Sequence, residues 1–246
     1  MKRLGWQFYL SVLLITISVF FYLLHYIFFS DEILIQSDIL LQLAFIPISV
    51  LIVTIIIDEL IERRVKMDRL KKLNILIGSF FSEFGIALLI SCSNADPNVD
   101  RIRKILTVKD NWTDQEFNNA KKQLVNYSYE IDIHGIHLDK LRNFLSEKRI
   151  FLLRVMENPT LLEHESFTNV LLSIFHVLDE LVQRKEMKKL PDRDLEHLEG
   201  DINRAYTLLV NQWLDYMKYM KDNYPYLFSL AMRTNPFDKD ASPIIK

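Results

Sequence analysis

The chain has 246 residues, of which 50% are hydrophobic and 25% are charged, and its formal net charge is -2 at pH 7. Five glycines and seven prolines exclude collagen-like and low-complexity sequences, and a single cysteine, Cys92, excludes a disulfide framework and any all-cysteine metal site. The near-neutral charge supplies no bulk attraction for nucleic acid, so we expect no nucleic-acid partner.

Two apolar stretches near the N-terminus predict membrane spans. Residues 6–29 carry no formal charge and 19 of these 24 residues are apolar, and in residues 39–57 the apolar share is 15 of 19. A helix needs about 20 such residues to cross the bilayer core. A signal peptide is disfavoured, because its apolar region would be shorter and would end in small residues, where this chain has Tyr26 and Phe28. We therefore predict a transmembrane hairpin over residues 1–57, with the lipid bilayer as a partner.

The charges beside these spans predict their orientation. Lys2 and Arg3 precede the first span, and the connection 30–38 contains neither Lys nor Arg. Six basic residues follow the second span, namely Arg63, Arg64, Lys66, Arg69, Lys71 and Lys72. Since basic residues are retained on the cytoplasmic side, both termini and the main domain are expected there. The same basic residues are suited to contact anionic lipid headgroups.

Three acidic residues, Asp31, Glu32 and Asp38, lie in the short connection between the spans. In a homo-oligomer they would form a ring at a pore mouth that concentrates cations. In a plain membrane anchor they would be a solvated turn. The sequence leaves both interpretations open.

A third apolar stretch covers residues 73–92. As a membrane helix it would place Glu83 near the bilayer centre, at a cost of several kcal/mol. Small and polar residues also form one stripe along it: Asn74, Gly78, Ser82 and Gly85. We favour a cytosolic helix, buried on most sides, within a juxtamembrane helix over residues 58–92 that continues the second span. A membrane-surface position or a third span stays open.

The sequence after residue 92 predicts further helices, so we expect an all-α fold, with an antiparallel helical bundle over residues 93–233 and a tail over 234–246. Capping-box patterns at Thr113–Glu116 and Thr160–Glu163 mark two helix starts. Helices are expected from these two starts and over about 136–156, 194–223 and 226–232. The block 127–133 is interpreted as the end of a helix.

Histidines are the first residues that we consider as metal ligands. His134 and His137 are spaced to bind one metal ion if both lie on a helix, but Gly135 between them favours a turn, and we interpret the pair as a helix junction. His176 shares a polar stripe with Asn169, Ser173 and Glu180, which is typical of a solvated helix face. The Glu-x-x-His motif of di-iron bundles is absent, so we assign no metal ligand and no cofactor.

Known catalytic motifs are missing as well, since the chain has no nucleophile elbow, phosphate-binding loop or dinucleotide fingerprint. We therefore expect a membrane-anchored helical protein that acts by protein–protein interaction, as a scaffold, sensor or regulatory subunit, and not as an enzyme. Its partners would be an unidentified protein and further copies of itself, through the spans or the bundle. The alternative is a homo-oligomeric ion channel that the cytosolic bundle gates.

Overall fold

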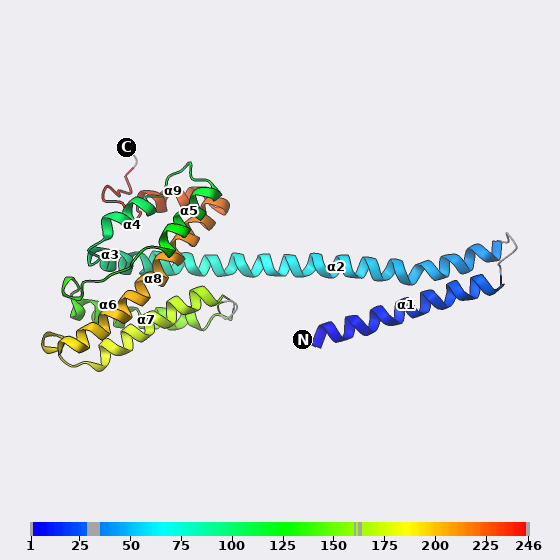
Figure 1. Cartoon of the computed structure of the whole chain (residues 1–246), viewed down its shortest axis with the longest axis horizontal. Helices are drawn as coiled ribbons and strands as arrows, with labels where there is room; N and C mark the ends of the chain where they lie inside the picture. Colours follow the sequence, from blue (N-terminus) through cyan, green and yellow to red (C-terminus); the bar gives the residue numbers. More distant parts are fainter. Residues whose placement is uncertain (1, 29–34, 160, 162–163, 245–246) are drawn as a thin grey trace. The chain divides into compact units, whose positions relative to one another are not determined.

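The computed structural model describes the chain except for residues 1, 29–34, 160, 162–163 and 245–246 (Figure 1). Its regular elements are all helices, with no strand among the residues described, which confirms the all-α prediction. The chain divides into two compact units, Met1–Arg69 and Leu70–Lys246.

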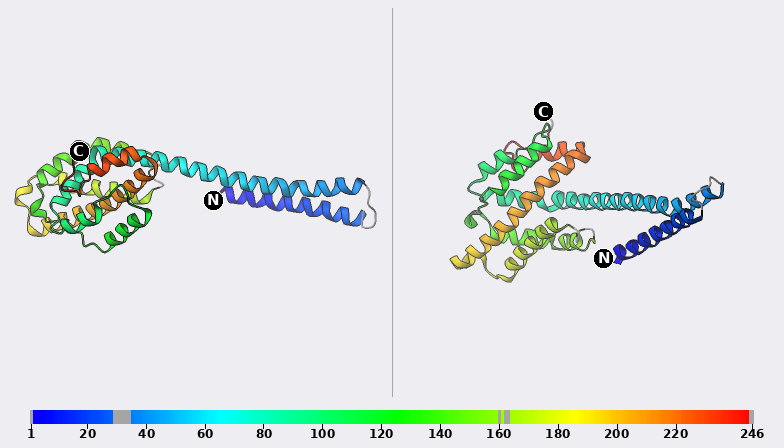
Figure 2. Two further views of the ribbon diagram at one scale, coloured as in Figure 1. Left: turned by 90° about the horizontal axis from the view of Figure 1, so that it is seen from above. Right: turned by 45° about the vertical axis from the view of Figure 1, so that its right-hand side comes forward.

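The first unit is a helical hairpin. Helix α1 (Lys2–Phe28) runs beside the first part of α2 (Ile35–Phe80), as Figures 1 and 2 show. The buried hydroxyl of Ser18 donates a hydrogen bond of 2.7 Å to the carbonyl of Ala44, and this contact ties the two helices together. Helix α1 over Phe8–Ile27, and a second helical stretch that begins at Gln42, are long and apolar enough to cross a membrane.

The core of the second unit begins inside α2. Leu73, Ile77 and Phe80 repeat at spacings of four and three residues, which places them on one helix face, and all three are buried. A single π-helical turn (Phe81–Gly85) and α3 (Ile86–Asn94) continue the same helical path. The apolar stretch 73–92 thus supplies core side chains to this unit, which favours the buried-helix interpretation over a third span.

The remaining helices of the second unit pack on α8 or on a helix that contacts it. They are α4 (Val99–Leu106), α5 (Asp114–Val125), α6 (Leu138–Met156), α7 (Glu165–Gln183), α8 (Asp192–Asn223) and α9 (Pro225–Arg233), with short 3-10 turns at Ile133–Gly135 and Met187–Lys189. Helix α8 contacts α3, α5, α7 and α9, and α6 packs on α7. The helices expected over 136–156, 194–223 and 226–232 correspond to α6, α8 and α9, whose ends differ from the expected ones by at most two residues.

Local signals explain some of the helix ends. The predicted capping box of Thr113 and Glu116 is present at the start of α5. The second capping box, at Thr160 and Glu163, lies outside the described residues. The interpretation of block 127–133 as a helix end is wrong, because α5 ends at Val125 and the chain then runs irregularly into a 3-10 turn.

The C-terminal segment differs from the tail expected from residue 234. Asn235 is buried and donates a hydrogen bond of 2.7 Å from its side-chain amide to the carbonyl of Leu106. The buried ring of Phe237 meets Trp213 of α8 edge to face, with ring centres 5.1 Å apart. The chain therefore belongs to the core at least as far as Phe237.

Candidate functional site

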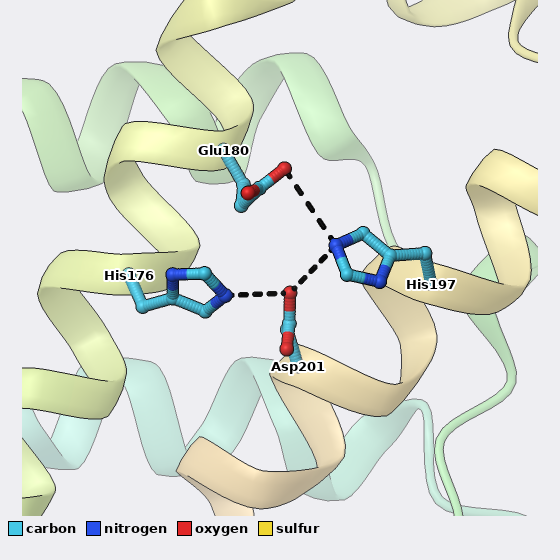
Figure 3. Close-up of side chains that lie close together, drawn as sticks. All are labelled: His176, Glu180, His197 and Asp201. Carbon is cyan, nitrogen blue, oxygen red and sulfur yellow. Dashed lines mark ion pairs between the residues drawn. The ribbon is translucent and has the colours of Figure 1, made fainter.

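Four side chains of ligand type converge where the end of α7 faces the start of α8. His176 and Glu180 are one helical turn apart on α7, and His197 and Asp201 are one turn apart on α8 (Figure 3). Residues i and i+4 share a helix face, so each helix presents one histidine and one carboxylate to the other. One ligand atom from each of the four residues lies within 4.8 Å of the other three.

Asp201 is the central residue of this cluster. Its Oδ2 lies 3.1 Å from Nε2 of His176 and 3.4 Å from Nε2 of His197. Glu180 completes the group, with Oε2 at 3.8 Å from Nε2 of His197. Figure 3 shows the Asp201 carboxylate between the two rings, with Glu180 above it and facing the same nitrogen of His197.

Burial distinguishes Asp201 from its neighbours. The Asp201 side chain is 4% exposed, whereas those of His176 and His197 are 46% and 54% exposed. Although both Nε2 atoms are close, neither is oriented to donate a hydrogen bond, and the buried Oδ2 has no hydrogen-bond partner. A buried carboxylate oxygen without a donor is costly, so this atom is suited to a positively charged ligand.

Two arginines form ion pairs with the carboxylates of the cluster. Nη1 of Arg204 lies 3.2 Å from Oδ1 of Asp201, which leaves Oδ2 to the histidines. Arg184 contacts Oε2 of Glu180 at 2.6 Å and also pairs with Asp194, so it joins α7 to α8. Its hydrogen bonds lower the pKa of both Glu180 and Asp194 below the usual range, so both are ionised at neutral pH.

The cluster does not contain the Glu-x-x-His motif, so a search for that motif could not find it. The interpretation of His176 as part of a solvated helix face is incomplete, because His176 also belongs to this cluster. The informative signal is a pair of four-residue spacings, His176-x-x-x-Glu180 and His197-x-x-x-Asp201. Each spacing alone is common on a solvated helix. Only the packing of α7 on α8 brings the two pairs together.

The histidines singled out from the sequence lie elsewhere. His134 is in a 3-10 turn, His137 precedes α6, and both are exposed. Oδ1 of Asp132 accepts a hydrogen bond from the backbone of His134, and Asp139 pairs with Arg142. Within the described part of the chain, neither histidine belongs to a group of three or more potential ligands.

The six basic residues that follow the second predicted span lie along α2 and are exposed: Arg63, Arg64, Lys66, Arg69, Lys71 and Lys72. Arg63 pairs with Glu59 one turn earlier, at 2.7 Å. Of the acidic connection, Asp31 and Glu32 are outside the described residues, and Asp38 lies in α2 with its side chain also outside them.

A second polar group is enclosed in the core of the second unit. Asp96 accepts hydrogen bonds from the Tyr127 hydroxyl at 2.7 Å and from the Asn98 backbone at 2.8 Å. Burial raises the pKa of Asp96, and it raises the pKa of the nearby Cys92 thiol to about 12. Since these groups are closed to solvent, we interpret them as structural.

Family models match both units of the chain. The model for the C-terminal helical domain of uncharacterized protein MJ1433 matches residues 69–233, and the model for its N-terminal helical domain matches residues 2–61. The chain belongs to the MJ1433 family. The two matched ranges leave residues 62–68 between them, and the structure divides the chain into its two units just after that segment, at Arg69.

A relative from Methanocaldococcus jannaschii, uncharacterized protein MJ1433, is 48% identical over 229 residues. The alignment covers 93% of this chain and 92% of the relative, so the similarity extends over both units. No solved structure matches the chain.

Proposed function

We propose that this protein is a membrane-anchored helical module that acts by binding a protein partner. The observation that carries the proposal is the surface of the hairpin in the first unit. Its large apolar side chains are exposed along both helices, for example Phe8, Ile15, Phe20, Phe45, Ile52 and Ile56. Water is an unfavourable environment for such a continuous apolar surface, whereas lipid is a favourable one.

The charges support a cytoplasmic second unit. The exposed basic run on α2 begins at Arg63, six positions after the apolar part of that helix ends at Ile57, and Lys2 and Arg3 lie at the other end of the hairpin sequence. Retention of basic residues on the cytoplasmic side then directs the connection around Asp31 outward. The basic run also provides attraction to anionic lipid.

The second unit offers a surface for a partner. Helix α9 exposes Tyr226, Leu227 and Leu230, and a groove of about 520 Å³ lies between the end of α2, the end of α8 and the start of α9. Tyr216 and Tyr219 also line the groove. Exposed aromatic side chains beside a concavity are typical of sites where proteins bind one another.

Cysteine labelling of the full chain in intact cells tests the proposed topology. A cysteine at Ser30→Cys should react with a membrane-impermeant maleimide, and one at Ala241→Cys should react only after permeabilisation. The native Cys92 is an internal control, because burial shields its thiol and the chain without added cysteines should stay unlabelled. Labelling of Ala241→Cys in intact cells would contradict the proposed orientation.

Stoichiometry and ion flux distinguish the module from a pore. The full chain, purified and reconstituted in liposomes, should be a monomer or dimer and should pass no ions. A stable ring of four or more copies that conducts would overturn the binding-module proposal. In that case conductance should fall in the double variant Asp31→Asn/Asp38→Asn, because the acidic ring at the pore mouth would be lost.

A further inference from the structure

We propose that His176, His197 and Asp201, with Glu180 as a fourth ligand, bind one divalent transition-metal ion, for which Zn²⁺ is the best fit. This inference goes beyond the anchoring and interaction function, and it holds or fails independently of it. It concerns only residues of the second unit that lie between α7 and α8 (Figure 3).

The donor set selects the class of ion. Two imidazole nitrogens with one or two carboxylates suit Zn²⁺ and neighbouring transition metals. Mg²⁺ and Ca²⁺ prefer six or more oxygen ligands, so two histidines make this site unfavourable for them. A tetrahedral site with metal–ligand bonds of about 2.0–2.1 Å separates its donor atoms by about 3.4 Å. The separations from Asp201 Oδ2 to the two Nε2 atoms are 3.1 and 3.4 Å, close to that value, and all four ligand atoms lie within 4.8 Å of one another.

The buried oxygen of Asp201 is an independent observation that points to a bound cation. Oδ2 is aimed at the space between the two rings and has no hydrogen-bond partner there. If both rings were simply protonated partners of this carboxylate, their N–H groups would be expected to donate to it. Both Nε2 atoms lie close to Oδ2 without a hydrogen bond to it, so a cation held between them would satisfy an oxygen that the rings leave unpartnered.

The remaining contacts leave the site usable. Arg204 contacts only Oδ1 of Asp201, so Oδ2 keeps a free lone pair. Arg184 occupies Oε2 of Glu180, so Glu180 would join the ion through its other oxygen or through a small rotation. The half-exposed rings of His176 and His197 give an ion access from solvent. A bound ion would then connect α7 to α8 beside the Arg184 contacts that already join them.

The test is metal binding to the full chain in detergent after chelator treatment. Titration calorimetry with ZnCl₂ should give one ion per chain, and MgCl₂ should give no binding. The variants His197→Ala and Asp201→Asn should each weaken Zn²⁺ binding by more than about 100-fold, beyond what loss of an outer-shell partner costs. The matched control His134→Ala removes an exposed histidine outside the cluster and should bind as the unchanged chain does.

A second measurement needs no variant, so it decides the question even if a substituted chain fails to fold. Co²⁺ in place of Zn²⁺ should produce visible absorption bands, and the bound ion should protect His176 and His197 from diethyl pyrocarbonate, while His134 and His137 stay reactive. Absence of Zn²⁺ and Co²⁺ binding would overturn the proposal. Binding that persists in His197→Ala and Asp201→Asn, or protection of other histidines only, would overturn it too.

Discussion

Replacing Trp213 with alanine is expected to lower the free energy of unfolding of the second unit by about 3–5 kcal/mol. Trp213 is 1% exposed on α8, the helix that contacts most of the other helices of this unit. Its truncation removes a large buried side chain and leaves a cavity against Phe237. Because domains are stable by only about 5–15 kcal/mol, this loss is a large share of the total.

Thermal unfolding of the full chain, followed by circular dichroism, measures this effect. The control Tyr226→Ala changes a side chain that is 72% exposed and should shift stability by less than about 0.5 kcal/mol. A loss of less than about 1 kcal/mol for Trp213→Ala would contradict a close-packed core at this position. It would also contradict the docking of the C-terminal segment on α8 through Phe237.

Gly85→Ala is expected to destabilise the second unit by about 1–3 kcal/mol, even though alanine is the better helix former. A Cβ atom at Gly85 would lie 2.6 Å from a carbon of the Phe81 ring and 2.9 Å from one of the Phe80 ring. Neither ring has room to move, because Phe81 stacks on Tyr216 and Phe80 meets Phe167 edge to face, each pair with ring centres 5.1 Å apart. The clash therefore outweighs the propensity gain of about 1 kcal/mol.

The matched control for this substitution is Gly200→Ala. Gly200 lies within α8, and a Cβ atom there would meet no atom within 4 Å. The same chemical change should therefore stabilise the chain by about 0.5–1 kcal/mol. Opposite signs for the two glycines in thermal unfolding would confirm the tight packing at the π-helical turn. Stabilisation by Gly85→Ala would contradict it.

Much of the helical layout could be predicted from local patterns. The capping box at Thr113 and the proline at the start of α9 act within one turn of chain, so their effect can be derived from neighbouring residues alone. The spacings of three, four and seven residues between Phe167, Val170, Ile174 and Leu181 likewise place these side chains on one helix face, and all four are buried in α7. The irregular segment after Val125 was missed, because it is held by contacts distant in sequence, such as the hydrogen bond that the backbone N–H of Asp132 donates to the carbonyl of Ala95.

The candidate metal cluster could not be derived in the same way. His176 and Asp201 are 25 positions apart, and in the sequence each has a polar residue four positions away, a spacing that is common on solvated helix faces. Their meeting depends on which turn of α7 packs against which turn of α8. That register is set by many small apolar contacts and not by any short motif.

The sequence by itself determined that this protein is helical, that its first 57 residues contain two stretches apolar enough for a membrane hairpin, and that it lacks the sequence motif of a phosphate-binding loop. These properties depend on composition and on spacings within a few turns, which are local. Only the tertiary structure decided that residues 73–92 contribute side chains to the core of the second unit, that Phe237 packs on Trp213, and that two histidines lie beside the buried Asp201. These are contacts between segments that are distant in the sequence. Their contribution to stability and to ligand binding depends on burial, which the sequence alone does not show.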